Sequence, residues 1–217
     1  MSISMQRIFP RQSALLVLIT LAAILFVCPG RLMAGGGLLN DVIGLELGMQ
    51  GYTIGKKLTS VQEKIARDHL EENAHAGTIK FLDRDLHVVV DKDSRRVLAL
   101  YVRQEDTSRQ GMKKMVADLM DRFGAPTLMA HDKIIYWAFN RHGAVSEDDF
   151  AKAKKVGQVP QLGIIATVKL NSDMEISSDP VDSDNGDGKK VAEERAGTVY
   201  FIITSDPLVR EFLDRLQ

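Results

Sequence analysis

The sequence predicts an α+β fold in which helices back an antiparallel sheet. Apolar, β-rich runs follow one another through short polar turns, which favours antiparallel pairing between neighbours in the chain. Segments with helical periodicity separate the groups of strands. Of the 217 residues, 45% are hydrophobic and 26% are charged, which excludes a disordered chain and a disulfide scaffold. The net charge of −1 gives no electrostatic footprint for nucleic acid.

Residues 1–34 match the pattern of a secretory signal. They carry basic but no acidic residues, and their apolar run covers residues 14–27. We expect cleavage after Ala34, which leaves residues 35–217 as a single periplasmic or secreted domain. That domain contains no cysteine and must be held by a hydrophobic core. Membrane attachment is expected only if Cys28 carries a lipid or the signal stays uncleaved.

The first half of this domain is expected to contain one helix and three strands. Residues 38–54 are apolar but rich in glycine, and we interpret them as a short strand with turns. Thr59 and Gln62 form a capping box that begins a helix running to about Glu72. β-rich runs follow at residues 78–82, 86–90 and 97–102. A polar turn joins the last two as a hairpin, and the third run is apolar on both faces, as a central strand is.

The next segment has the most regular helical pattern in the chain. Thr107 and Gln110 form a second capping box, and Gly124 followed by Pro126 ends the helix. Its apolar side chains fall on a single stripe, which consists of Met112, Met115, Val116, Leu119, Met120 and Phe123. We interpret the methionines as core residues.

The remaining elements are shorter. A polar loop at residues 143–160 contains a short helix at 147–155. Asp206 as N-cap and Pro207 at the first helical position begin the last helix. Strands are expected at residues 133–140, 162–170 and 198–204.

The two capping boxes suggest an internal repeat. Thr59 precedes the run 86–90 by nearly the same offset as Thr107 precedes residues 134–138. Side-by-side identity is low, so the hypothesis of two tandem helix-plus-hairpin units rests on the pattern.

A short motif carries a family resemblance. Residues 120–126 lead through Phe-Gly-x-Pro into a strand containing Ile135-Tyr136-Trp137, and a hairpin at 88–101 precedes them. Over roughly residues 50–140 this resembles the repeat unit of β-lactamase-inhibitor-like proteins and of the SmpA/OmlA-type lipoproteins of the β-barrel assembly machinery. The resemblance implies a small secreted binding module with a helix-backed antiparallel sheet.

Motifs for catalysis are missing from the predicted domain. It has no cysteine nucleophile, no Gly-x-Ser-x-Gly and no His-Glu-x-x-His. We therefore expect a non-enzymatic binding or assembly-accessory module whose partner is another protein. Two alternatives stay open: a periplasmic hydrolase whose dispersed site gathers His87 or His131 with carboxylates, and an envelope structural protein tethered by residues 1–34.

Aromatic side chains are the candidates for partner binding, because such residues anchor protein interfaces. We expect them on the sheet face away from the helices. Tyr136 and Trp137 are adjacent and point to opposite sides of their strand, so one of the two is free to enter the core. The candidates are Tyr101, Tyr136, Trp137 and Tyr200.

Residues 171–196 carry eight acidic and three basic side chains. A calcium loop needs alternating oxygen ligands, a turn glycine and a late carboxylate. With Gly188 as the turn, Asn185 and Asp187 would be ligands and Glu194 would close the site. We favour a turn-rich acidic hairpin loop over this calcium site, and no other cofactor is expected.

Overall fold

The computed structural model describes residues 35–130, 133–173 and 197–217. The predicted signal at residues 1–34, with Cys28, lies outside the described residues. So do His131 and the predicted calcium ligands Asn185, Asp187 and Glu194. All of the described residues belong to one compact unit, Met33–Gln217.

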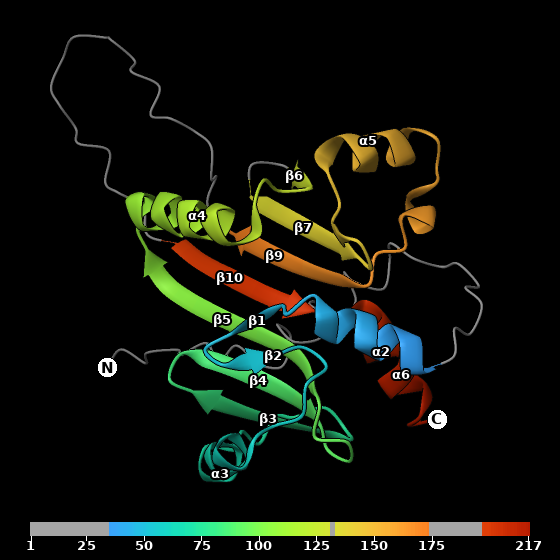
Figure 1. Ribbon diagram of the computed structural model, residues 1–217. Coiled ribbons are helices and arrows are strands. Elements are labelled where there is room, and N and C mark those ends of the chain that lie inside the picture. The colour runs from blue at the N-terminus through green and yellow to red at the C-terminus, as the bar shows by residue number, and fades with distance from the viewer. Residues whose placement is uncertain (1–34, 131–132, 174–196) are drawn as a thin grey trace, which may run out of the picture. The chain divides into compact units, whose positions relative to one another are not determined.

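The α+β prediction is confirmed. Eight strands form one antiparallel sheet in the order β3-β4-β5-β10-β9-β7-β6, and the short β8 pairs with β7 (Figure 1). β5 lies between β4 and β10, in the interior of the sheet, as its two apolar faces predicted. The strands are β3 (Thr78–Asp83), β4 (Leu86–Asp91), β5 (Val97–Thr107), β6 (Leu128–Ala130), β7 (Ile134–Asn140), β8 (Gly143–Ala144), β9 (Ala166–Ser172) and β10 (Gly197–Thr204).

Five helices of the described residues accompany the sheet. They are α2 (Gly35–Gly44), α3 (Ser60–Asp68), α4 (Arg109–Phe123), α5 (Glu147–Lys155) and α6 (Asp206–Asp214). A two-stranded ribbon of β1 (Gly48–Met49) and β2 (Tyr52–Thr53) follows α2, and a 3-10 turn, η1 (Val159–Leu162), follows α5.

The sheet repeats one order of elements in its two halves. From one edge inward, α3 is followed by β3, β4 and β5; from the other edge inward, α4 is followed by β6, β7 and β9. β10 pairs with both β5 and β9 and so joins the halves. β8, α5 and η1 stand between β7 and β9 and have no counterpart between β4 and β5, so the internal repeat stays a hypothesis.

The core lies between one face of the sheet and helices α2, α3, α4 and α6. Phe123, at the end of α4, packs against Trp137, Phe139 and Phe201 with ring centroids 6.2–6.4 Å apart. Figure 1 shows α4 and α2 on the same side of the sheet. The most deeply buried apolar side chains come from the sheet and from these helices, and they include Val42, Phe81, Leu86, Leu100, Met112, Ile135, Leu170 and Ile203.

The first segment of the domain differs from its prediction. Residues 35–44 form helix α2, and its residues 38–44 lie where we expected a short strand with turns. Its glycines obscured the pattern of Leu38, Leu39 and Val42, which share one helix face and pack on the core. Burial of that face outweighs the low helix propensity of glycine.

Two helix boundaries also differ. The capping box at Thr59 is present, but α3 ends at Asp68, because Glu71 then pairs by its backbone N–H with Lys80 of β3. The second helix is capped by Ser108, whose hydroxyl accepts from the backbone N–H of Gly111. The predicted cap, Thr107, is the last residue of β5.

The last helix is capped by Ser205, one residue before the predicted Asp206, while Pro207 stands in the first turn as expected. The helix predicted at 147–155 is confirmed as α5. β5 continues to Thr107, beyond the predicted 102, and β9 begins at Ala166, after the predicted 162. The short strands β6 and β8 were not predicted.

Candidate functional site

The sheet face away from α4 carries three of the chain's four tyrosines. Tyr101 of β5 and Lys169 of β9 both lie directly opposite Ile202 of β10, and Tyr136 of β7 lies opposite Lys169. Opposed residues point to the same side of a sheet. Tyr200, two positions from Ile202, points to that side as well. We define the tyrosine face as Lys80, His87, Tyr101, Arg103, Tyr136, Lys169, Tyr200 and Ile202.

Each tyrosine of this face has a cation over its ring. Lys80 Nζ lies 5.5 Å from the ring centroid of Tyr101, and Lys169 Nζ lies 5.6 Å from that of Tyr136. The Arg103 guanidinium lies 5.8 Å from the ring centroid of Tyr200. Such pairs contribute about 0.5–1 kcal/mol each at exposed sites. They also fix where the positive charges stand on the face.

A polar cluster lies at the β3 side of the face. The ammonium of Lys80 is 2.7 Å from one carboxylate oxygen of Glu71, and His87 Nδ1 is 3.1 Å from the other. The His87 ring stacks on Tyr101 with centroids 4.4 Å apart and an angle of 8°. Glu71 reaches these partners because its backbone pairs with β3 directly after α3.

Burial and hydrogen bonding set the protonation of these groups. Burial raises the pKa of Tyr101, and burial together with the nearby Asp206 raises the pKa of Tyr136. Burial alone would lower the pKa of Lys80, but its bonds to Glu71 and Tyr101 raise that pKa overall. At neutral pH the two phenols are therefore uncharged donors and Lys80 is a cation.

Two buried oxygens on β9 have no hydrogen-bond partner within the described part of the chain. They are Oγ1 of Thr167 and Oδ1 of Asn171. Both residues stand two positions from Lys169 and so share its side of the strand. Buried polar atoms are normally paired, so these two oxygens are exceptions among the described residues.

Trp137 does not belong to this surface. It lies on the helix-covered face, is 1% exposed and donates from its indole nitrogen to the carbonyl of Gly124 at 2.9 Å. Of the four aromatic residues predicted to bind a partner, the structure brings Tyr101, Tyr136 and Tyr200 together and places Trp137 in the core.

The cations of the tyrosine face were not predicted from the sequence as site residues. Arg103 could have been predicted from the sequence, because it stands two positions from Tyr101 in a strand and so shares its face. Lys169 and Lys80 could not be predicted to belong to the face, because their positions beside Tyr136 and Tyr101 depend on the order of strands in the sheet.

The geometry gives little support to the alternative of a hydrolase with a dispersed site. His87 does meet a carboxylate, but Glu71 is already bound by Lys80 at 2.7 Å. Neither the cavity beside α5 nor the one beside Asp91 is lined by His87. Residues 35–130, 133–173 and 197–217 contain no cluster of three His, Cys, Asp or Glu side chains that could hold a metal ion.

Comparisons with protein-family models, with curated proteins and with solved structures find no match for this chain. Among the helices of the described residues, none has both the length and the apolar character of a membrane span. The tyrosine face is therefore the feature from which function has to be inferred.

Proposed function

We propose that this protein is an exported binding module without enzymatic activity, and that its tyrosine face docks an acidic surface of another protein in the periplasm or outside the cell. The observation that carries the proposal is the gathering of Tyr101, Tyr136 and Tyr200 on one sheet face, each beside a cation. Tyrosine and arginine are the residues that most often dominate binding energy at interfaces.

The charges on this face favour an acidic partner. Lys80 and Arg103 have carboxylates at 2.7 Å and 2.6 Å, from Glu71 and Glu105. Lys169, in the centre of the row, has the Tyr136 ring beside it but no carboxylate within 4.0 Å among the described residues. A carboxylate of the partner would supply that missing charge and would be held by charge-assisted hydrogen bonds.

Two features of the sequence support export. The basic and apolar pattern of residues 1–34 is that of a secretory signal. The absence of cysteine from residues 35–217 removes thiol oxidation as a hazard of an oxidising compartment. The resemblance to inhibitor-like and assembly-accessory modules supports a binding role. Mass spectrometry of the mature N-terminus tests export: a first residue at Gly35 agrees with it, and an intact Met1 contradicts it.

The docking proposal is tested by site-specific photo-crosslinking in the native host. A photoreactive phenylalanine replaces Tyr200, and a control replaces Val61, which is 68% exposed on α3. We expect a defined adduct from position 200 that is absent from position 61. Lys169→Glu is expected to abolish the adduct, whereas Lys64→Glu on α3 leaves it unchanged. Equal adducts from both positions, or no effect of Lys169→Glu in a folded variant, would contradict the proposal.

A further inference from the structure

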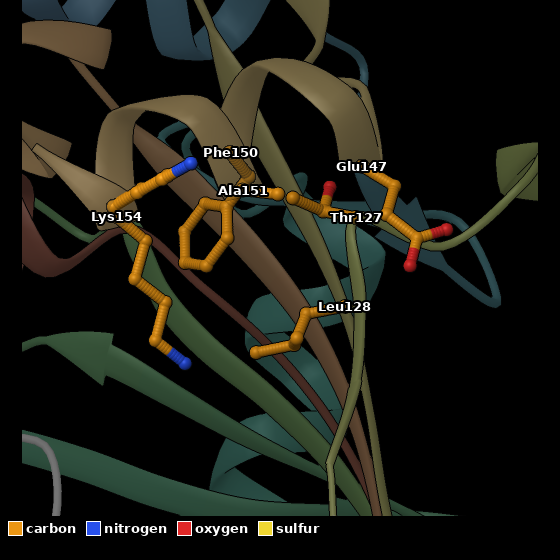
Figure 2. A pocket seen from close by; sticks show the side chains of 7 residues that line it. Thr127, Leu128, Glu147, Phe150, Ala151 and Lys154 are labelled. Atoms are coloured by element: carbon orange, nitrogen blue, oxygen red, sulfur yellow. The ribbon is translucent and has the colours of Figure 1, made fainter.

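A groove lies between helix α5 and the edge strand β6, apart from the cations of the tyrosine face. Its cavity has a volume of about 450 Å³ and is lined by Thr127, Leu128, Glu147, Phe150, Ala151, Lys154 and Lys155. That volume is in the range of sites that hold small ligands or peptide side chains. Figure 2 shows Phe150 and Leu128 in the middle, with Glu147 and Lys154 toward opposite ends.

One wall of the groove is the outer edge of the sheet. β6 pairs with β7 on one side and stands last in the strand order of the described residues. Thr127 fixes this edge, because its hydroxyl donates to the carbonyl of Val145 at 2.7 Å and accepts from the backbone N–H of Ala138 at 2.9 Å. An edge strand offers unpaired backbone groups to an incoming strand.

The other wall is α5. None of its side chains is fully buried. Its large apolar residue, Phe150, reaches the ring of Tyr136 with centroids 6.2 Å apart, so that its side chain forms the apolar base of the groove. The cavity of about 450 Å³ therefore lies between side chains of this helix and residues at the start of β6.

The charges along the groove are separated. Lys154 and Lys155 are exposed at the C-terminal end of α5. Neither has a carboxylate within 4.0 Å in the part of the chain that the structure describes, whereas Lys114 on α4 is paired with Asp118 at 2.7 Å. Two adjacent unpaired cations beside an apolar base are complementary to a segment that carries both carboxylates and apolar side chains.

We propose that this groove binds an extended acidic segment of a partner protein, which adds to β6 as a further strand. Its backbone pairs with β6, one apolar side chain enters the cavity over Phe150 and Leu128, and acidic side chains meet Lys154 and Lys155. Residues two positions apart in an extended strand point to the same side, so the segment carries its apolar and acidic residues at every second position, all facing α5.

The test uses three synthetic nonapeptides with blocked ends and measures their binding to the full chain by fluorescence anisotropy. The first has valine and glutamate in turn at its odd positions and threonine at its even positions, the second has lysine in place of glutamate, and the third is the first with alternate backbone nitrogens methylated. We expect binding of the first alone, because the second reverses the charge and the third removes the backbone donors.

Variants then locate the site. Lys154→Glu with Lys155→Glu is expected to weaken binding of the first peptide about tenfold. Lys64→Glu with Lys92→Glu, which makes the same change of net charge elsewhere, is expected to leave it unchanged. Hydrogen exchange of the amides at 128–130 is expected to slow when the peptide is added.

Three binding results would overturn the proposal: no binding of the first peptide at millimolar concentration, equal binding of the lysine peptide, or equal binding of the N-methylated peptide. A fourth would be slower hydrogen exchange of the amides at 128–130 as the protein concentration rises in the absence of peptide. The last result would assign the edge to a second copy of the chain. Because the peptides test the groove directly, their failure would leave the crosslinking test of the tyrosine face undisturbed.

Discussion

Arg215 donates a hydrogen bond of 2.7 Å to the carboxylate of Asp91, joining the end of α6 to the turn between β4 and β5. Asp91 is almost fully buried, with 3% of its side chain exposed. Burial alone would raise its pKa, but hydrogen bonds from Ser94, Arg215 and the backbone N–H of Asp93 hold the pKa below its usual value. The final helix is therefore attached to the sheet by a buried anion.

This contact predicts an acid-sensitive contribution to stability. A lowered carboxyl pKa stabilises the fold at pH values above the unfolded pKa, and this contribution is lost as the pH falls through the folded pKa. Arg215→Ala is expected to cost about 1 kcal/mol at pH 7, since Arg215 is half exposed, and much less at pH 2–3. Urea unfolding at both pH values measures the difference, with Lys92→Ala as a control. An equal loss of unfolding free energy at both pH values would contradict a contact between Arg215 and an ionised Asp91.

Tyrosine ionisation predicts a loss of stability at the alkaline end. The pKa values of Tyr52, Tyr101 and Tyr136 are all raised by burial, and for Tyr52 also by its hydrogen bond to Asp83. A raised pKa stabilises the fold below the unfolded pKa of about 10, and this stability is lost as the pH rises through the folded pKa. Tyr136→Phe is expected to flatten the loss between pH 10 and pH 12 in thermal melts. An unchanged slope would show that Tyr136 ionises as freely as in the unfolded chain.

The single tryptophan reports on the core. Trp137 is buried against Phe123 and bonds to the carbonyl of Gly124, the residue that ends α4. We expect a blue-shifted emission that moves to the red on unfolding. Trp137→Ala is expected to destabilise the domain by about 3–5 kcal/mol, whereas Tyr200→Phe on the other face is expected to change stability little. A native emission maximum typical of exposed indole would be inconsistent with this core.

Helix α4 offers a test of which residue caps it. Ser108→Ala is expected to cost about 1 kcal/mol, because the Ser108 hydroxyl accepts from the backbone N–H of Gly111 at 3.1 Å. Thr107→Val keeps the shape of its buried side chain and removes a long bond of 3.4 Å to the carbonyl of Gln104. It is expected to cost clearly less. Denaturant titrations of the two variants measure their free energies of unfolding. A larger loss for Thr107→Val than for Ser108→Ala would identify Thr107 as the cap.

Local patterns were sufficient for much of the fold. The single stripe of α4, the short helix α5 and the two apolar faces of β5 each depend on neighbours in the sequence, and each was predicted. Helix α2 was missed because its glycines dominate the local propensity, while the burial of Val42 is a tertiary effect.

The site was predictable only in part. Strand alternation gave the opposite directions of Tyr136 and Trp137. The face away from α4 holds three of the four candidates, but Phe150 of α5 packs on Tyr136, so this face is not free of helices as expected. The pairing of Lys169 with Tyr136, however, requires β9 to lie beside β7, and Tyr101 joins them only because β10 lies between β5 and β9. Such cross-strand contacts are set by topology, which no local pattern specifies.

The central place of β10 has a consequence for the timing of folding. During synthesis the strands β3, β4 and β5 leave the ribosome first and β6, β7 and β9 follow, but β5 and β9 do not pair with each other. Until residues 197–204 emerge, a nascent chain has two half-sheets, each with an inner edge open to aberrant pairing. Cooperative folding thus waits for nearly the whole polypeptide, and a chaperone that holds the nascent chain until then would protect those two edges.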